Sequence, residues 1–400
     1  MLAYTLTLTT AVLAHVGAPV DAVDIHAVDE TSRALEASVG LAWTEDGDDW
    51  RWVCHEAITS PDAVITPRYA IAGRHWLATV PRVAESRTEA DAVYWTDDGC
   101  SWTMADGLHG HEVPAVALDT SGTIALAVSG DDAADNAIYR SIDGGRTFTS
   151  VLVVSDQRLT SVVIAEGGAN TAMVGGVDTS GRGWLHWSRD LGVTWSSAAV
   201  TDGEVVAMAL HPASPDVGYA IIDGVGVDTL IYTHDGGASI EVLIDPEGVI
   251  SDVEVGADGQ AWVAFGGMAF LHAGDGVHFE LATDAPPGLG LDLRDDRVLL
   301  ATRFELVNSA LAEGTPAEGF DPVFTFTAFD GPLDCPEGTH AADICNNLFP
   351  VLQESLGLVG SDDSGLGEGG GSTGEGAGSG TGGTTASDTG AATDPDTADT

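Results

Sequence analysis

The chain has 400 residues, of which 14 are basic and 62 acidic, giving a formal net charge of −48; all 14 basic residues are arginine. The absence of lysine excludes a Schiff-base lysine and a phosphate-loop lysine. Nucleic acid and anionic membranes are disfavoured as partners, because proteins bind both through basic patches. The acidic excess suits salty surroundings or bound cations, either of which offsets its self-repulsion.

Residues 1–18, MLAYTLTLTTAVLAHVGA, resemble a secretory signal peptide, with an apolar centre and small residues near the end. The stretch lacks a basic start, and a buried first strand is the alternative. Every other apolar run is interrupted by Gly, Asp or Pro before it reaches membrane-spanning length, so no transmembrane helix is expected. We therefore expect an exported protein, extracellular or in the cell envelope.

A short segment then recurs along residues 19–332. It reads RSIDGGRTF at 140–148, WSRDLGVTW at 187–195 and YTHDGGASI at 232–240, with weaker copies at 42–50, 94–102 and 271–279. Aligned on the first copy's Asp, the copies fall at positions 45, 97, 143, 190, 235 and 274, a period near 45 residues. Such a period is typical of radial β-sheet repeats in which each unit supplies four strands.

The sequence between the copies consists of pairs of apolar runs separated by turn residues, which is the pattern of β-hairpins. Six copies and a final unit predict an all-β propeller of seven four-stranded blades, with six or eight as alternatives. The first unit is short on its N-terminal side, so late strands are expected to complete it and close the ring.

Each position of the segment has a structural role. A short polar side chain such as Asp143 can hydrogen-bond amides of its own turn, and Gly145 permits a positive φ. The final aromatic, Phe148 or Trp195, is expected to bury its ring between sheets. The residues predicted to hold these turns are Asp97, Trp102, Ser141, Asp143, Gly145, Thr147, Phe148, Ser188, Asp190, Gly192, Thr194, Trp195, Thr233, Asp235 and Gly237.

The pattern S-x-D-x-G-x-T-[FW] resembles the Asp-box, or bacterial neuraminidase repeat, of sialidases, sortilin-type receptors and photosystem-assembly propellers. The resemblance covers roughly residues 20–330. It implies that each copy lies between the third and fourth strands of a blade, at the periphery and away from a central pocket. The repeat therefore predicts architecture, and no activity follows from it.

The C-terminal part differs in composition. Residues 333–358 are predicted to form a cysteine loop and a helix with Ile344, Leu348, Leu352 and Leu356 on one face, capping the propeller or docking a partner. Residues 359–400, rich in Gly, Ser, Thr and Asp, are predicted to be a disordered acidic tail. The whole resembles exported myxobacterial-type proteins with a propeller, a cysteine pair and a spacer.

The four cysteines, an even number, favour an oxidising compartment. Cys335 and Cys345 flank a short segment and are expected to pair, which leaves Cys54 with Cys100; the two other connectivities stay open. A zinc site is disfavoured because no Cys-x-x-Cys spacing occurs.

No catalytic residue is predicted. Sialidases resemble one another in an arginine triad and a Tyr–Glu pair, and the nearest match, TPRYAIAGRHW at 66–76, lacks the Ile-Pro that follows the first arginine. For metals, Asp131, Asp132 and Asp135 are weak Ca²⁺ candidates and HGHE at 109–112 is another, but solvated loops are the favoured interpretation because no EF-hand spacing is present. No cofactor is expected, with Ca²⁺ as the alternative.

These patterns predict an exported, monomeric, non-catalytic propeller that binds a protein or glycan at the cell surface. The alternatives are a sialidase-like glycoside hydrolase and a structural envelope protein whose acidic surface binds cations.

Overall fold

The computed structural model describes residues 20–58, 67–80, 93–131, 135–224, 226–244, 248–267, 269–294 and 297–358. The chain divides into two units, Met1–Val359 and Gly360–Thr400. The predicted signal peptide at 1–18 and the predicted tail at 359–400 lie outside the described residues.

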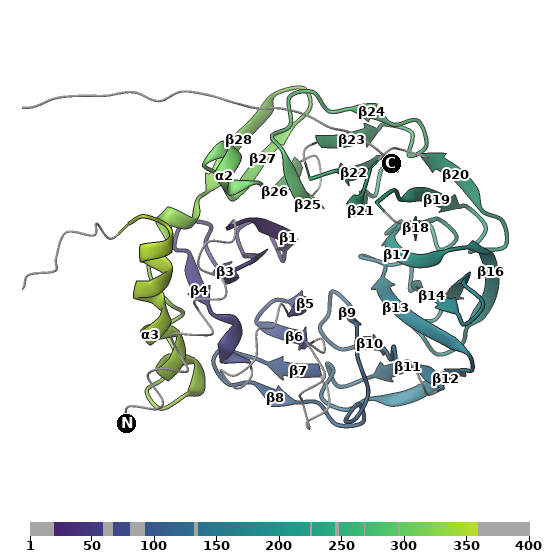
Figure 1. The fold of residues 1–400 in the computed structure, drawn as a ribbon, viewed down its shortest axis with the longest axis horizontal. Coiled ribbons are helices and arrows are strands. Elements are labelled where there is room, and N and C mark those ends of the chain that lie inside the picture. The colour runs from purple at the N-terminus through teal and green to yellow at the C-terminus, as the bar shows by residue number, and fades with distance from the viewer. Residues whose placement is uncertain are drawn as a thin grey trace, which may run out of the picture. The chain divides into compact units, whose positions relative to one another are not determined.

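Seven antiparallel sheets of four strands follow one another around a ring (Figure 1). The first four blades are β1 (Ala22–Ala27), β2 (Arg33–Ala37), β3 (Gly40–Thr44) and β4 (Arg51–Val53); β5 (Arg68–Ala72), β6 (His75–Thr79), β7 (Val93–Thr96) and β8 (Thr103–Met104); β9 (Ala115–Leu118), β10 (Ala125–Val128), β11 (Asn136–Ser141) and β12 (Thr149–Val154); β13 (Gln157–Ile164), β14 (Ala172–Asp178), β15 (Arg182–Ser188) and β16 (Ser196–Asp202).

The last three blades are β17 (Glu204–Leu210), β18 (Gly218–Asp223), β19 (Thr229–Thr233) and β20 (Glu241–Ile244); β21 (Ile250–Val255), β22 (Ala261–Phe265), β23 (Ala269–Ala273) and β24 (Glu280–Leu281); β25 (Gly288–Arg294), β26 (Arg297–Thr302), β27 (Leu311–Thr315) and β28 (Gly319–Phe324). The helical elements are η1 (His55–Ala57), α2 (Phe304–Val307), η2 (Phe326–Ala328) and α3 (His340–Ser355). The prediction of seven four-stranded blades is confirmed. Within the described part of the chain, no helix is long and apolar enough to span a membrane.

The faces of neighbouring sheets pack against each other and form the core. Between blades 2 and 3, for example, Leu77, Val116, Tyr139 and Phe148 belong to one buried cluster. Burying such side chains stabilises the fold by about 1.5–3 kcal/mol each. Strands covered on both faces have continuous apolar sequences, which explains why β10 reads ALAV with all four residues buried.

The ring closes without strand exchange, so the expectation that late strands complete the first blade is wrong. Residues 22–53 supply all four strands of blade 1 in chain order, and β1 lies beside β25 of blade 7 (Figure 1). Asp292 Oδ2 accepts a hydrogen bond from the Ala27 amide at 2.6 Å, and Arg303 Nε lies 2.8 Å from Asp21 Oδ2. Side chains thus link the first and last blades.

Residues 330–333, the strap, run along the outer edge of blade 1. The Trp52 amide donates to the Gly331 carbonyl and the Leu333 amide donates to the Trp52 carbonyl, both at 2.9 Å. The strap therefore adds a short parallel pairing to β4. The expected boundary at residue 332 falls inside this strap, which belongs to blade 1 by its hydrogen bonds.

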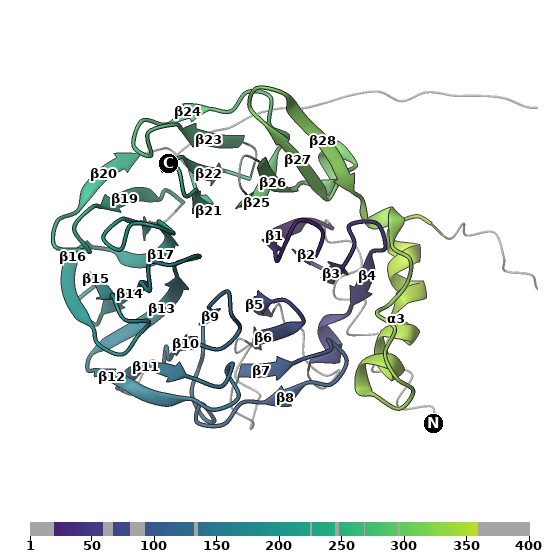
Figure 2. The ribbon, with the colours of Figure 1, turned by 180° about the vertical axis from the view of Figure 1, so that it is seen from behind.

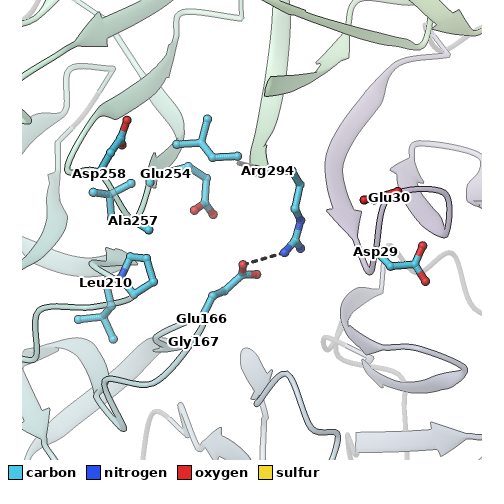
Figure 3. A pocket seen from close by; sticks show the side chains of 13 residues that line it. Asp29, Glu30, Glu166, Gly167, Leu210, Glu254, Ala257, Asp258 and Arg294 are labelled. Atoms are coloured by element: carbon cyan, nitrogen blue, oxygen red, sulfur yellow. Dashed lines mark hydrogen bonds and ion pairs between the residues drawn. The ribbon is translucent and has the colours of Figure 1, made fainter. Parts of the chain in front are cut away.

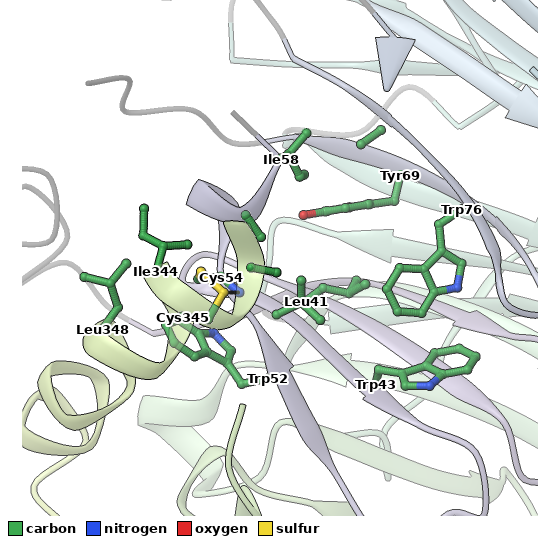
Figure 4. Packing of buried hydrophobic residues seen from close by; sticks show 14 of the residues in the cluster. Leu41, Trp43, Trp52, Cys54, Ile58, Tyr69, Trp76, Ile344, Cys345 and Leu348 are labelled. Carbon is green, nitrogen blue, oxygen red and sulfur yellow. Dashed lines mark hydrogen bonds between the residues drawn. A yellow bond between two sulfur atoms is a disulfide. The ribbon is translucent and has the colours of Figure 1, made fainter. Parts of the chain in front are cut away.

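Helix α3 follows the strap and packs on the same outer edge, as Figures 1 and 2 show. Thr339 caps its first turn, with the Ala342 amide 3.3 Å from the Thr339 hydroxyl. Ile344, Leu348 and Leu352 are buried in the cluster of blades 1 and 2 (Figure 4). The predicted helix is present, and it covers the side of blade 1.

The predicted disulfide pairing is wrong. The bonds are Cys54–Cys345 and Cys100–Cys335, with Cα–Cα distances of 5.5 and 5.4 Å. Cys335 lies just after the strap, whose Leu333 lies against Gly99 in the tight turn of blade 2. Cys345 is on α3, which lies beside η1 (Figure 4). The two cysteines, close in sequence, therefore reach different blades. Two disulfides indicate an oxidising compartment.

Candidate binding pocket at the centre of the ring

The repeated segment at 141–148 joins β11 to β12, and its polar side chains bind its own backbone. Ser141 Oγ accepts a hydrogen bond from the Gly145 amide at 2.8 Å and donates to Asp143 Oδ1 at 2.6 Å. Asp143 accepts from the amide and hydroxyl of Thr147 at 2.9 and 2.7 Å. Gly145 has φ of +79°, and a Cβ there would lie 2.7 Å from Leu77 Cδ1, so glycine is required.

The turns of blades 4 and 5 have the same hydrogen bonds. In each, a hydroxyl accepts from the glycine amide at 2.9 Å, and the aspartate accepts from a backbone amide at 2.8 Å and from a second hydroxyl. The residues involved are Ser188, Asp190, Gly192 and Thr194 in blade 4 and Thr233, Asp235, Gly237 and Ser239 in blade 5. Trp195 adds a bond from its indole Nε1 to the Gly192 carbonyl at 3.1 Å.

In blade 2 the aspartate of the turn is Asp98, a correction to the predicted Asp97. Asp98 Oδ1 accepts from the amides of Cys100 and Ser101, both at 2.8 Å, and from the Thr96 hydroxyl at 3.0 Å. The aspartate lies two residues after the hydroxyl in both turns, but the glycine follows the hydroxyl by three residues here and by four in blade 3. The aspartate is therefore displaced by one position relative to the glycine. The same displacement makes Asp46 and Asp275 the turn aspartates of blades 1 and 6, in place of positions 45 and 274.

Asp97 instead connects two blades. Its carboxylate lies 2.7 Å from a guanidinium nitrogen of Arg146 in blade 3, and its Oδ1 lies 2.6 Å from His75 Nδ1. Partial burial opposes its ionisation, but these two partners outweigh that effect and lower its pKa. Trp102, at the end of the turn, donates from its indole to the Gly99 carbonyl at 3.2 Å.

The turn aspartates lie in separate blades, and turn hydroxyls and amides occupy their carboxylates. Hydrogen bonds from Ser239 lower the pKa of Asp235 to about 2. For Asp143, hydrogen bonds from Ser141 and Thr147 outweigh partial burial and likewise lower the pKa. These carboxylates are therefore ionised and structurally engaged, and they do not converge on one cavity.

Of the weak Ca²⁺ candidates, the structure describes Asp131 and Asp135. Asp131 accepts a hydrogen bond from the Glu112 amide at 2.9 Å, and its other oxygen lies 2.8 Å from His111 Nδ1. Asp135 is exposed, and Asp132 lies outside the described residues. The HGHE segment and the acidic loop thus contact each other through His111 and Asp131, a pairing that sequence spacing did not indicate.

A pocket of about 660 Å³ lies where the inner strands of blades 1, 4, 5, 6 and 7 end, and we call it the central pocket (Figure 3). Its charged lining consists of Asp29, Glu30, Glu166, Glu254, Asp258 and Arg294. Its apolar lining consists of Leu210, Pro212, Val255, Ala257 and Leu293. Because strands alternate in direction, the turns after first strands emerge at the same end of each sheet as the repeated turns, so both lie on one face of the ring.

Arg294, at the end of β25, is committed to neighbours within the protein. Its guanidinium lies 3.2 Å from a Glu166 oxygen across the pocket and 3.3 Å from Asp292, and it donates to the Ala27 carbonyl (Figure 3). Burial opposes its charge, but the surrounding carboxylates outweigh that effect and raise its pKa. Arg294 therefore balances part of the acidic charge at this end of the ring.

Carboxylates accumulate beside the pocket on inner strands β1, β21 and β25. Burial, together with repulsion from Asp24, raises the pKa of Asp252 well above its usual value. For Asp292, burial outweighs the attraction of Arg294 and raises the pKa to about 7. Asp252 accepts from the Leu291 amide at 2.7 Å, so it also joins blade 6 to blade 7.

One group of side chains has the donor set of a divalent-cation site. Oxygens of Asp24 and Glu36 and a ring nitrogen of His26 lie within 4.8 Å of one another. His26 Nε2 is 2.8 Å from Glu36 Oε1, which also accepts from the Tyr69 amide at 3.0 Å. Although burial opposes its protonation, Glu36 and Asp24 raise the pKa of His26 to about 9. His26 therefore carries a proton at neutral pH and pairs with Glu36 in this group.

The sequence prediction did not include the carboxylates of the central pocket. A signal was present, because acidic residues interrupt the apolar inner strands AVDIHA, ISDVEV and GLGLDLR. An acidic side chain inside such a strand is unusual and marks a position facing a polar partner or solvent. Which of these residues meet could not be read from spacing, because they come from three blades.

No family model and no curated protein sequence matches the chain. Among solved structures it is similar to a GH74 enzyme from Niastella koreensis, at 12% identity and a TM-score of 0.48 over 79% of this chain and 66% of that one, just under two thirds of its length. It is also similar to YCF48 from Cyanidioschyzon merolae, at 16% identity and a TM-score of 0.49 over 71% of this chain and 94% of that one. A third similar structure is the Dos1 propeller, at 8% identity and a TM-score of 0.48 over 77% of this chain and 87% of that one. Its own sheet topology makes the protein a seven-bladed β-propeller, and its likeness to these structures extends to the fold alone.

Proposed function

We propose that the protein is an exported, non-catalytic scaffold that binds a protein or glycan ligand at the cell surface. The observation that carries this proposal is the engagement of the repeated aspartates by their own turns, which leaves recognition to the central pocket and the loops around it. The two disulfides support an oxidising location.

The face that carries the pocket is suited to binding because its turns are fastened to one another. The Gly144, Leu191 and Gly236 amides of three repeated turns each donate, at 2.9 Å, to the carbonyl of Thr123, Asn170 or Asp216 in the first-to-second-strand turn of the same blade. Rigid turns lose little conformational entropy when a ligand binds.

The experiment that tests this proposal compares substitutions on the two faces of the ring. Pro212→Trp alters the pocket rim, and Ser180→Trp is its control in an exposed turn at the opposite end of blade 4. Glycan arrays and binding to defined cell-surface fractions should show saturable binding that Pro212→Trp weakens at least tenfold and Ser180→Trp leaves within twofold. Equal effects of the two substitutions, or no saturable binding, would contradict the proposal.

A glycoside hydrolase is the second candidate, favoured by one observation. Burial and neighbouring carboxylates raise the pKa of Glu254 well above its usual value, and a carboxyl with a raised pKa is what a general acid requires. Against sialidase chemistry, Arg294 is the one arginine among the described lining residues, and carboxylates already engage it. A panel of fluorogenic glycosides, with Glu254→Gln as the inactive control, decides between the two.

A further inference from the structure

Building on the proposed binding function, we propose that the central pocket receives a lysine or arginine side chain of a protein partner, with its cationic head on Glu254 and its alkyl stem on the apolar wall. The inference concerns the chemistry of the ligand. It rests on the shape and lining of the pocket and on the surroundings of Glu254.

The charge of the pocket favours a cation. Five carboxylates and one guanidinium line it, and the guanidinium of Arg294 is occupied by Glu166, Asp292 and the Ala27 carbonyl. An anionic ligand would meet an excess of carboxylates and no available arginine among the described lining residues. A cationic ligand would find several acceptors.

Glu254 is a half-buried acceptor that receives no hydrogen bond from the described residues. It is the penultimate residue of β21, and its carboxylate points into the pocket (Figure 3). No described residue donates a hydrogen bond to this carboxylate, whereas Asp252, Glu166 and Asp292 add repulsion to the effect of burial. A half-buried carboxylate without a donor is unfavourable, and an ammonium or guanidinium group brought by a ligand removes that cost.

The pocket also offers apolar contact, which a bare metal ion does not use. Leu210, Pro212, Ala257 and Leu293 lie beside the carboxylates. Lysine and arginine place methylene groups along such surfaces while their charged ends reach polar partners. A volume of about 660 Å³ accommodates one such side chain with its flanking backbone. Carboxylates next to an apolar wall therefore favour a ligand with a cationic group at the end of an alkyl chain.

The test is isothermal titration of the full-length chain in 0.15 M salt with defined probes. The probes are the capped peptides Gly-Gly-Arg-Gly-Gly and Gly-Gly-Lys-Gly-Gly, the uncharged citrulline peptide, spermidine, and CaCl₂ alone. We expect the arginine or lysine peptide to bind and the citrulline peptide to bind at least tenfold more weakly. Binding of CaCl₂ or spermidine without binding of either peptide would overturn the inference in favour of a metal site or a free polyamine.

Three variants separate the pocket from the general acidic surface. Glu254→Gln should weaken peptide binding at least tenfold, and Ala257→Trp, which fills the pocket from an exposed turn without changing charge, should do the same. Glu280→Gln removes an exposed carboxylate from the outer strand of the same blade and should leave binding within twofold. Equal weakening by Glu280→Gln would mean that the cation binds the surface at large and would overturn the inference.

The same variants distinguish this inference from the proposed function. In one outcome, the Glu254→Gln variant still binds the ligand identified with glycan arrays or cell-surface fractions, and the cationic peptides do not bind the native protein. The scaffold function then stands and the pocket assignment fails. If the peptides bind and the Pro212→Trp and Ser180→Trp variants show no difference in the surface assay, the pocket assignment stands and the proposed function fails.

Discussion

Adjacent aspartates in the turn of blade 2 have different roles. Asp98 accepts two backbone amides inside the turn, whereas Asp97 reaches across to Arg146 of the next blade. Bonds to turn amides satisfy donors that would otherwise be unpaired in a tight turn. A largely exposed ion pair competes with water and is screened by salt.

Replacement of each aspartate by alanine should therefore have unequal effects. We expect Asp98→Ala to lower the free energy of unfolding by about 1–3 kcal/mol, because two amides lose their acceptor. Asp97→Ala, the matched control, should cost at most about 1 kcal/mol. Denaturant titration of both variants measures the difference in the free energy of unfolding. An equal or larger loss of that free energy for Asp97→Ala would show that Asp98 is not the residue that holds the turn.

At the scale of residues, the sequence predicted the turns correctly where it contained a single candidate aspartate. Ser141, Asp143 and Gly145 occupy the expected positions, and all three take part in the hydrogen bonds of the turn. The sequence TDDG at 96–99 allows either Asp97 or Asp98 to be the turn aspartate, and only the positions of the backbone amides that bind the carboxylate distinguish the two. Glu254 and Arg294 were not predicted, because their meeting depends on how separate blades converge.

At the scale of elements, the C-terminal segment secures blade 1 from outside. The strap pairs with β4, α3 buries one face against the same blade, and disulfides join the segment to blades 1 and 2. Repeats and helical periodicity predicted the strands and the helix, since both are local patterns. The disulfide connectivity was not predictable, because it depends on which blade each cysteine reaches.

Removal of the bond between η1 and α3 should weaken this attachment. In Cys54→Ala/Cys345→Ala, we expect the free energy of unfolding to fall by about 2–5 kcal/mol, since the native bond links residues 291 apart and lies in a buried cluster. Thermal unfolding under non-reducing conditions measures the loss. The native protein unfolded under reducing conditions is the control, and an unchanged melting temperature in both cases would show that the segment contributes no stability.

At the scale of the whole molecule, the acidic groups near the centre of the ring make stability depend on pH. Burial raises the pKa of Asp292 from 3.8 to about 7, so the folded state holds a proton there that the unfolded chain lacks between those values. Burial opposes protonation of His26, but Glu36 and Asp24 outweigh it and raise the pKa of His26 from 6.5 to about 9. Between those values the folded state again holds a proton that the unfolded chain lacks. Stability contributed by each group is therefore lost as pH rises.

We expect the melting temperature to fall as pH rises from about 5 to 9, measured in buffer with a chelator so that bound metal does not contribute. Asp292→Asn should flatten the part of the profile below pH 7, and His26→Gln should flatten the part above it. Below pH 4 the trend should reverse, because turn carboxylates such as Asp235, whose pKa is lowered to about 2, contribute stability that is lost as pH falls from about 4 towards 2. A melting temperature that rises steadily from pH 5 to 9 would contradict the assignment.

The closure of the ring has an evolutionary consequence. The four strands of each blade come from one uninterrupted stretch of chain, and the strap adds its short pairing to blade 1 from outside. A single in-frame duplication or deletion of about 45 residues would therefore add or remove one complete sheet without splitting another. Genes for rings of this kind can change blade number in one step, provided that the cysteines of the first two blades and the C-terminal segment are kept together.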